Sequence, residues 1–255
     1  MEYFNQQQFA EQLDTEDVLK DFRSQFHIPI HKGQEQIYFC GNSLGLQPKN
    51  TSLYLDQELE KWRNLAVEGW FTGDDNWINY LQHLRTPLSK IVGAKPSEVT
   101  VMNNLTVNLH LMLTTFYQPT STRFKILTEA GAFPSDQYAL ETHLKTRDIN
   151  PETAILEVFP RENEHIFYTE DILQLIHENK DSLAMVMLGG INYYNGQVLD
   201  MPLITQTAQA YGIVVGFDLA HCVGNIPLQL HIHFSTNLLA TQTQNKPKFS
   251  ENEKI

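Results

Sequence analysis

The sequence is poor in cysteine and in positive charge. Its two cysteines, Cys40 and Cys222, are too few for a disulfide framework, which indicates a reducing, cytoplasmic setting. Lys and Arg number 18 against 30 Asp and Glu. The resulting net charge of −12 argues against nucleic acid and against an anionic membrane surface as partners.

Long apolar runs and targeting signals are also missing. No segment approaches the ~20 apolar residues that a membrane-spanning helix needs, and the first residues lack the basic and apolar regions of a signal peptide. No residue set suggests a metal site. The βα turns contain no Gly-x-Gly-x-x-Gly or P-loop pattern, which disfavours a generic nucleotide-binding module. A chain of 255 residues, 42% hydrophobic, is expected to form one large globular domain or a domain and a half.

What the sequence does contain is a regular alternation of strand-like and helix-like segments. Starts of helices are indicated by Ser135, Thr169 and Asp200, which are residue types that cap a helix N-terminus. Alternation of this kind predicts βαβ units and a mostly parallel sheet. The expected strands are 98–102, 123–127, 154–159, 183–188 and 213–217, and the expected helices are 51–68, 106–117, 135–146, 169–179 and 201–211.

An acidic residue and a histidine follow the last expected strand. Asp218 and His221 stand at its carboxyl end, which is the edge where open α/β sheets bind ligands. A carboxylate there can hold a pyridinium nitrogen protonated, and His221 can bond to the same ligand or to Asp218. The alternative is structural: Asp218 caps a turn and His221 packs in the core.

Three further segments are candidates for ligand contacts. Asn103–Thr106 offers a helix N-terminus that suits a phosphate, or Asn104 or Thr106 only caps that helix. Gly131–Asp136 offers Phe133 for stacking on a flat ring and Asp136 as an acceptor. Its alternative is a βα loop in which Ser135 caps the helix and Phe133 is buried. Gly41–Gly45 suits positive φ angles and a close backbone approach, or it is a surface turn.

The order of these segments resembles the kynureninase family of pyridoxal-phosphate enzymes. The similarity runs from about Tyr38 to His231. The matching blocks are Tyr38–Lys49, Asn104–His110, Ala132–Asp136, Tyr194–Gln197 and Phe217–His221 followed by Gly224-Asn225.

The resemblance implies a fold and a set of site residues. The fold is α/β, the large domain of fold type I (aspartate-aminotransferase-like, class V), with a mostly parallel sheet, flanking helices and an incomplete C-terminus. Its cofactor is pyridoxal 5′-phosphate. The implied roles are phosphate binding by Leu105 and Thr106, ring stacking by Phe133 with Asp136 beside it, ring-nitrogen pairing by Asp218 with His221 next to it, and substrate contact by Ser43 and Trp70.

The resemblance also implies a reaction. Kynureninases hydrolyse the Cβ–Cγ bond of L-kynurenine or 3-hydroxykynurenine, giving anthranilate or 3-hydroxyanthranilate and L-alanine, in tryptophan catabolism and NAD biosynthesis. The family is homodimeric. Gly189 stands where some relatives have a serine, which removes one hydroxyl from the cofactor contacts.

One departure from the family pattern is expected to matter for activity. The lysine that forms the Schiff base lies in a Tyr-Lys pair whose place falls on Thr243–Asn245, where no such pair is present. Lys246 and Lys248 follow in a polar run that is typical of a disordered tail. Ile232-His233 replaces an expected Asp-Trp. The chain is therefore interpreted as a C-terminally truncated member with an exposed sheet edge, inactive alone.

The expected organisation has three parts. Residues 1–70 form an N-terminal arm and part of a small domain, 71–231 a partial cofactor-binding domain, and 232–255 a divergent tail. The alternative function is a catalytically silent member of the fold that acts as a binding or regulatory partner.

Overall fold

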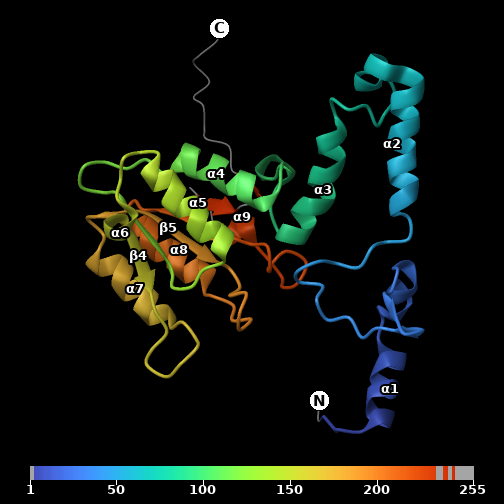
Figure 1. The fold of residues 1–255 in the computed structure, drawn as a ribbon, viewed down its shortest axis with the longest axis horizontal. Helices are drawn as coiled ribbons and strands as arrows, with labels where there is room; N and C mark the ends of the chain where they lie inside the picture. The colour runs from blue at the N-terminus through green and yellow to red at the C-terminus, as the bar shows by residue number, and fades with distance from the viewer. Residues whose placement is uncertain (1–2, 234–237, 241–242, 245–255) are drawn as a thin grey trace. The chain divides into compact units, whose positions relative to one another are not determined.

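The computed structural model describes residues 3–233, 238–240 and 243–244. The chain divides into two compact units, Met1–Ile78 and Asn79–Ile255 (Figure 1). In the part of the chain that the structure describes, no helix is long and apolar enough to cross a membrane.

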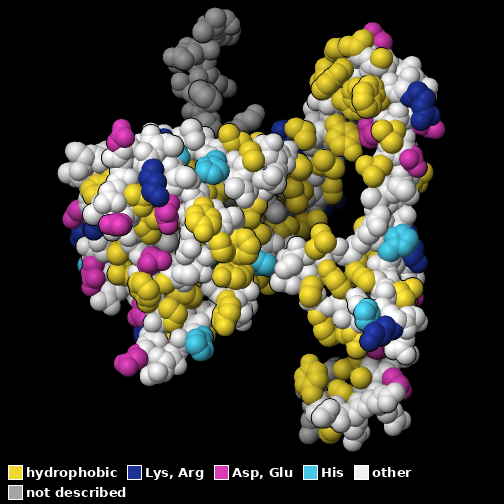
Figure 2. Space-filling model, in the orientation of Figure 1, with side chains coloured by type: hydrophobic (Ala, Val, Ile, Leu, Met, Phe, Trp, Pro, Cys, Tyr) yellow, Lys and Arg dark blue, Asp and Glu magenta, His cyan; other side chains and the backbone are white. Residues whose placement is uncertain are grey.

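The first unit has almost no interior. It contains α1 (Gln7–Glu16), the hairpin β1–β2 (Ile30–His31 and Gln34–Glu35), α2 (Thr51–Leu65) and short 3₁₀ turns at Lys20–Gln25 and Ala66–Trp70. Among its described residues only Gly69 is buried. Hydrophobic side chains such as Leu55, Leu59 and Trp62 are therefore at its surface. Figure 2 shows hydrophobic side chains exposed along this unit.

The second unit is built on a parallel sheet. Its strand order is β4-β3-β5-β6-β7-β8, in which β4, β3, β5, β6 and β7 run parallel and β8 is antiparallel to β7. The α/β fold with a mostly parallel sheet is as predicted. The strands are β3 (Lys125–Glu129), β4 (Ile155–Val158), β5 (Leu183–Gly189), β6 (Val214–Asp218), β7 (Leu238–Ala240) and β8 (Thr243–Gln244).

Helices cover both faces of this sheet because its side chains alternate between two cores. Ile126 and Met185 pack with α4 and α5, while Leu127 and Val186 pack with α7 and α8 on the opposite face (Figure 1). The helices are α3 (Tyr80–Val92), α4 (Leu105–Phe116), α5 (Pro134–Lys145), α6 (Pro151–Ala154), α7 (Thr169–Glu178), α8 (Met201–Ala210) and α9 (Leu230–His233).

One prediction about a strand and one about the sheet edge need correction. Residues 98–102 form no strand: Pro96–Glu98 is a 3₁₀ turn in which the Glu98 carboxylate accepts from the Lys95 N–H at 2.9 Å. Val99 is extended but pairs with no strand in the described ranges. The edge of β6 is not exposed, because β7 pairs with it in the segment expected to be a disordered tail. Residues 234–237, 241–242 and 245–255 of that segment lie outside the described residues.

Of the three predicted helix caps, the structure confirms the one at Asp200. The Asp200 side chain accepts from the Leu203 N–H and caps α8, as predicted. Ser135 and Thr169 do not cap: α5 and α7 begin after Phe133 and Tyr168, with no side-chain cap at either.

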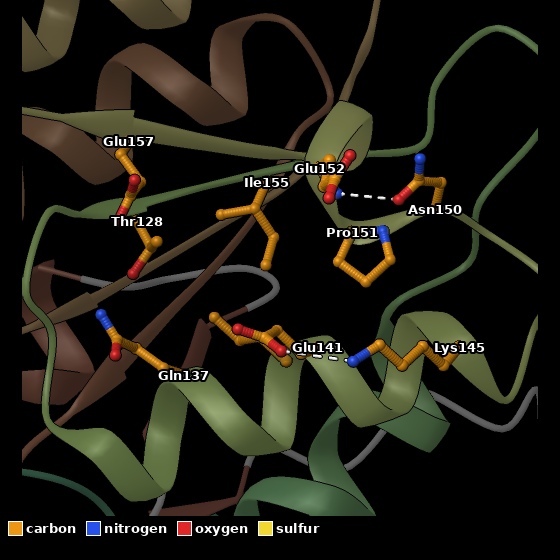
Figure 3. Close-up of a pocket in the computed structure, with 10 residues that line it drawn as sticks. Thr128, Gln137, Glu141, Lys145, Asn150, Pro151, Glu152, Ile155 and Glu157 are labelled. Atoms are coloured by element: carbon orange, nitrogen blue, oxygen red, sulfur yellow. Dashed lines mark hydrogen bonds and ion pairs between the residues drawn. The ribbon is translucent and has the colours of Figure 1, made fainter.

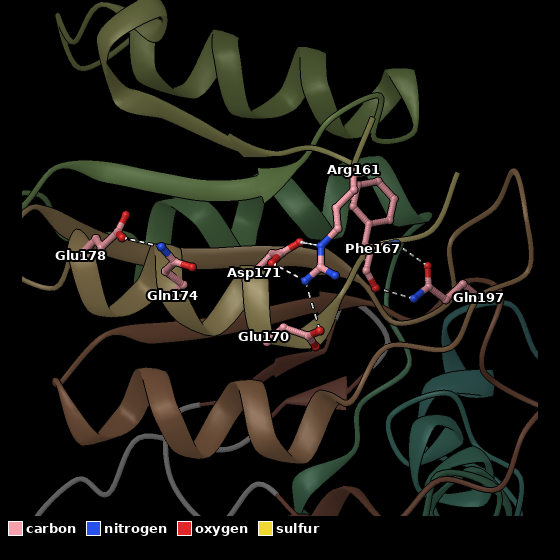
Figure 4. A network of polar contacts seen from close by, with 7 residues as sticks. All are labelled: Arg161, Phe167, Glu170, Asp171, Gln174, Glu178 and Gln197. Atoms are coloured by element: carbon pink, nitrogen blue, oxygen red, sulfur yellow. Dashed lines mark hydrogen bonds and ion pairs between the residues drawn. The ribbon is translucent and has the colours of Figure 1, made fainter. Parts of the chain in front are cut away.

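The loop 190–199 is fixed by Gln197, a residue of one matching block. Its side-chain amide donates to the Phe167 carbonyl at 2.6 Å and accepts from the Phe167 N–H at 2.8 Å (Figure 4). Nearby, Arg161 pairs with Asp171 at 2.9 Å and Glu170 at 3.1 Å. The Gln197 hydrogen bonds tie the loop before α7 to the loop after β5, and the Arg161 ion pairs tie the loop before α7 to the first turn of that helix.

Candidate cofactor site

Three carboxyl groups meet at the carboxyl edge of the sheet. Glu129 ends β3, Asp218 ends β6, and Asp136 lies in the first turn of α5, the helix after β3. Gly189 ends β5, which lies between β3 and β6, and it pairs with Asp218. The parallel directions of these strands bring residues distant in sequence to one place.

Asp136 and Asp218 interact directly. Asp136 is 7% exposed, and its carboxyl forms a hydrogen bond to that of Asp218. Burial, followed by the charge of Asp218, raises the pKa of Asp136 to about 7. Asp218 also accepts from the Ala220 N–H at 2.8 Å. The pair therefore holds a proton near neutral pH when no cation lies beside it.

Glu129 is a site residue that the sequence analysis missed. It is 6% exposed, and both of its carboxylate oxygens accept from the Gly189 N–H, at 3.0 and 3.2 Å. Burial is the main cause that raises its pKa. The signal was available: Glu129 ends a buried strand as Asp218 does, but the strand was expected to stop at Leu127.

The three carboxyl groups are suited to a cationic ring nitrogen, from which a carboxylate can accept a hydrogen bond. In the described ranges, no ion pair joins Glu129, Asp136 or Asp218 to a basic side chain. Among the described residues, no three or more His, Cys, Asp or Glu side chains are arranged so that they could hold a metal ion. Strand order reverses direction between β3 and β5, the kind of crevice where α/β sheets bind ligands. A protonated pyridine nitrogen would supply the missing positive charge.

Phe133 lies at the surface, immediately before α5, the helix that contains Asp136. It precedes α5, is 45% exposed, and packs edge-to-face on Tyr193 with ring centroids 5.2 Å apart. The alternative that Phe133 is a core residue is wrong. Its position leaves the side chain available for stacking, and that role stays a prediction.

The N-terminus of α4 has backbone donors for an anion. The Asn104 side chain accepts from the Val107 N–H at 3.0 Å, so Asn104, rather than Thr106, is the cap. Leu105 and Thr106 occupy the first turn, where backbone N–H groups have no partner inside the helix. In the part of the chain that the structure describes, no hydrogen bond or ion pair joins them to the carboxyl cluster, and their role toward a phosphate stays a prediction.

The turn after β6 contains His221 and Cys222. His221 is half-buried, and its backbone carbonyl accepts from the Asn225 side chain at 3.1 Å. Cys222 is fully buried, and burial with the charge of Asp218 raises the pKa of its thiol to about 12. Cys222 is therefore a packing residue rather than a nucleophile.

Ser43 lies in the first unit, in an exposed turn. The turn is closed by the Ser43 N–H, which donates to the Cys40 carbonyl at 2.9 Å. Gly41 and Gly45 do not adopt positive φ, and a Cβ on either would meet open space. The positive-φ part of the prediction is therefore wrong, the segment is a surface turn, and a close backbone approach to a ligand stays a prediction.

Trp70, the second predicted substrate residue, lines a pocket of the same unit. The pocket measures about 570 Å³. Trp70 packs edge-to-face on Trp77 with centroids 5.6 Å apart, and the Trp77 indole N–H donates to Glu58 at 2.6 Å. Glu58 pairs with Lys61 at 2.8 Å, and this contact is the first cause that lowers the Glu58 pKa. The pocket is lined by Leu55, Glu58, Leu59, Trp62, Trp70 and Trp77.

A second pocket, of about 440 Å³, lies beside α5 and β4 (Figure 3). Glu141 and Lys145 form an ion pair at 3.4 Å on one wall, and Thr128 and Glu157 lie on neighbouring strands of the other. None of the predicted site residues lines this pocket. It is separate from the carboxyl cluster.

Comparison with curated proteins identifies kynureninases as relatives. The chain is 52% identical to the kynureninase of Flavobacterium psychrophilum over 231 residues, which is 91% of this chain and 54% of that protein. It is 50% identical to that of Myxococcus xanthus over 224 residues, 88% of this chain and 53% of the relative. The chain thus spans about half the length of the curated relatives it matches. No protein-family model matches it.

Solved structures share the fold. A cystine C-S lyase in complex with cysteine persulfide superposes with a TM-score of 0.62 at 14% identity, covering 78% of this chain and 51% of that one. The cysteine desulfurase CsdA of Escherichia coli gives a TM-score of 0.62 at 13% identity, covering 84% and 51%. These similarities confirm the predicted fold class, the large domain of fold type I.

Proposed function

Because the chain is a homologue of the kynureninases over 91% of its length, we propose that it binds pyridoxal 5′-phosphate and contributes the cofactor end of a kynureninase-type site. The observation that supports this most strongly is the cluster of Glu129, Asp136 and Asp218, which no basic side chain in the described ranges pairs with. Asp136 and Asp218 share a hydrogen bond, and burial followed by the charge of Asp218 raises the pKa of Asp136 to about 7, a setting that favours a bound cation.

Each residue has one task in this proposal. Asp218, with Asp136 beside it, holds the proton on the ring nitrogen, and Phe133 covers one ring face. Leu105 and Thr106 bind the phosphate with N–H groups and a hydroxyl at the start of α4. His221 lies next to Asp218. When bound, the protonated ring withdraws electrons from the substrate carbon, which is the chemistry the cofactor supplies.

The proposed substrate is L-kynurenine or 3-hydroxykynurenine. Hydrolysis of its Cβ–Cγ bond gives anthranilate or 3-hydroxyanthranilate and L-alanine, as in tryptophan catabolism and NAD biosynthesis. Ser43 and Trp70 are proposed to contact this substrate. Trp70 bears on substrate preference, because its exposed ring offers an apolar edge to an aryl group.

Turnover by these 255 residues alone is not part of the proposal. The place of the lysine falls on Thr243–Asn245, and Lys246 and Lys248 lie outside the described residues. We therefore expect the chain to bind the cofactor and to release no anthranilate by itself. Measurable anthranilate fluorescence after incubation with L-kynurenine and pyridoxal 5′-phosphate would contradict this part.

Calorimetric titration with pyridoxal 5′-phosphate tests cofactor binding. We expect saturable binding at one site per chain. The affinity of D218N is expected to be lower than that of the wild type by about tenfold or more, because the charge on the ring-nitrogen partner is lost. D200N is the matched control, because asparagine caps a helix as well as aspartate does. T106V and T114V form a second pair of test variant and control. T106V removes the hydroxyl proposed to bind the phosphate in the first turn of α4, and T114V removes a hydroxyl from its last turn. Wild-type chain that does not bind contradicts the proposal.

A cytoplasmic homodimer is proposed as the setting. The first unit supports it, because large apolar side chains such as Trp62, at 66% exposure, are exposed among its described residues. Sedimentation equilibrium at micromolar concentration tests it. A mass of 29.4 kDa at all concentrations would contradict it.

A further inference from the structure

The carboxyl ends of β3 and β5 are joined by a side chain. Among the described residues, backbone pairing between these strands ends at Leu127 and Val186, whereas β5 stays paired with β6 as far as Gly189 and Asp218. Beyond Leu127, the Glu129 carboxylate accepts twice from the Gly189 N–H. Glu129 therefore closes the gap that opens between the two strands where the strand order reverses.

Gly189 is matched to this carboxylate. A Cβ at position 189 would lie 3.0 Å from Glu129 Oε1 and 3.3 Å from the Ile191 carbonyl oxygen. Both contacts are tighter than ordinary van der Waals distances, so any larger residue displaces the Glu129 side chain or the loop after β5. A side chain at position 189 would therefore require the Glu129 carboxylate or the Ile191 backbone to shift by a few tenths of an ångström.

We propose that Glu129 is a positioning residue of the cofactor site: by holding the Gly189 amide, it sets where Asp218 lies relative to Asp136. The inference rests on the proposed function. Gly189 pairs with Asp218, and the Gly190 N–H donates to the Asp218 carbonyl at 2.8 Å, so a shift of the β5 end moves the β6 end. Asp136 follows β3 and moves with Glu129.

The charge of Glu129 acts in the same direction as its hydrogen bonds. The groups that face the cluster are Asp136 with Ser135 from α5, Asp218 from β6, and Cys222 from the turn after it. A third carboxylate among them favours a cation at this point.

Two variants separate the hydrogen bonds from the charge. E129A removes both, whereas E129Q keeps one oxygen acceptor for the Gly189 N–H. E157Q is the matched control, since Glu157 lies on the adjacent strand β4 in register with Thr128. Binding of pyridoxal 5′-phosphate by calorimetry is expected to weaken about 10- to 100-fold in E129A, less in E129Q, and to stay at the wild-type value in E157Q.

A second measurement needs no cofactor. In the ¹⁵N-labelled chain, exchange of the Gly189 amide is expected to be slow, to become faster in E129A and to be partly restored to slow exchange in E129Q. Amides in the middle of β5 keep their protection in all three chains, which shows that the variants are folded. A general loss of stability would instead raise exchange throughout β5.

Gly189 provides the reciprocal test. G189A is expected to weaken binding of pyridoxal 5′-phosphate in the wild-type background and to have a smaller effect in the E129A background, because no carboxylate is then displaced. Equal affinity of E129A and wild type, or a Gly189 amide that exchanges alike in both, overturns the role of Glu129. Failure of the wild type itself to bind contradicts the proposed function, and the role falls with it.

Discussion

The carboxyl groups of Asp136 and Asp218 share a hydrogen bond at the carboxyl edge of the sheet. One of them comes from the first turn of α5 and the other from the end of β6. Asp136 is buried and Asp218 is half-buried, and ionising two carboxyl groups this close together is unfavourable, so the chain without a ligand holds a proton between them. This proton makes the stability of the chain depend on pH.

The first prediction concerns that dependence. The folded-state pKa of Asp136, about 7, lies above its ordinary value of 3.8, so the folded chain binds more protons than the unfolded chain between these values. Stability from this group is complete below pH 3.8 and is lost as pH rises through 7, by up to about 4 kcal/mol. D136N removes the titration.

Urea unfolding of the wild type and D136N at pH 5 and pH 8.5 measures this. The free energy of unfolding of D136N minus that of the wild type is expected to be larger at pH 8.5 than at pH 5, which means that D136N gains stability relative to the wild type as pH rises. The comparison cancels the other carboxylates, which titrate in both chains. An identical difference at the two pH values would exclude a shared proton at this pair.

The second prediction concerns the cap of α4. Asn104 accepts from the Val107 N–H, and N104A leaves that donor without its partner. We expect N104A to lower the free energy of unfolding by about 1 kcal/mol, and N104D to have little effect, because aspartate caps equally well. D200A, which removes the side-chain cap of α8, is the reference variant, because the loss of stability in N104A is compared with that in D200A. N104A as stable as N104D would contradict the assignment.

The third prediction concerns the loop after β5. The Gln197 amide bonds to both the N–H and the carbonyl of Phe167, and Q197A is expected to cost about 2 kcal/mol, since each neutral hydrogen bond contributes about 1 kcal/mol. Gln174 on α7, whose side chain donates to Glu178 at the surface, provides the control Q174A (Figure 4). The two variants are compared by chemical denaturation, and equal stability would show that the loop is not held by Gln197.

The fourth prediction concerns Phe133. F133L removes an aromatic face from the site, so affinity for pyridoxal 5′-phosphate is expected to fall about 3- to 10-fold, in line with an aromatic contact of about 1 kcal/mol. Y193F keeps the ring that packs on Phe133 and is expected to bind normally. F159L changes another exposed phenylalanine and serves as the control. Unchanged affinity in F133L would exclude stacking.

Much of the fold was predictable because its elements have strong local patterns. The apolar runs that became β5 and β6 are bounded by turn residues, and Asp200 with Pro202 marks the start of α8. Residues 98–102 misled because a strand needs a partner, and an apolar run does not reveal whether one exists. Glu129 was missed for a related reason: its importance comes from the Gly189 amide, which is distant in sequence.

The most direct test of the account uses pyridoxal 5′-phosphate labelled with ¹⁵N in the ring. Bound to the wild-type chain at pH 8, the nitrogen is predicted to show the chemical shift of a protonated pyridinium, held by Asp218 with Asp136 beside it. In D218N the shift is predicted to move toward that of neutral pyridine. A neutral nitrogen in the bound wild-type complex, or no bound signal at saturating concentration, would contradict the account.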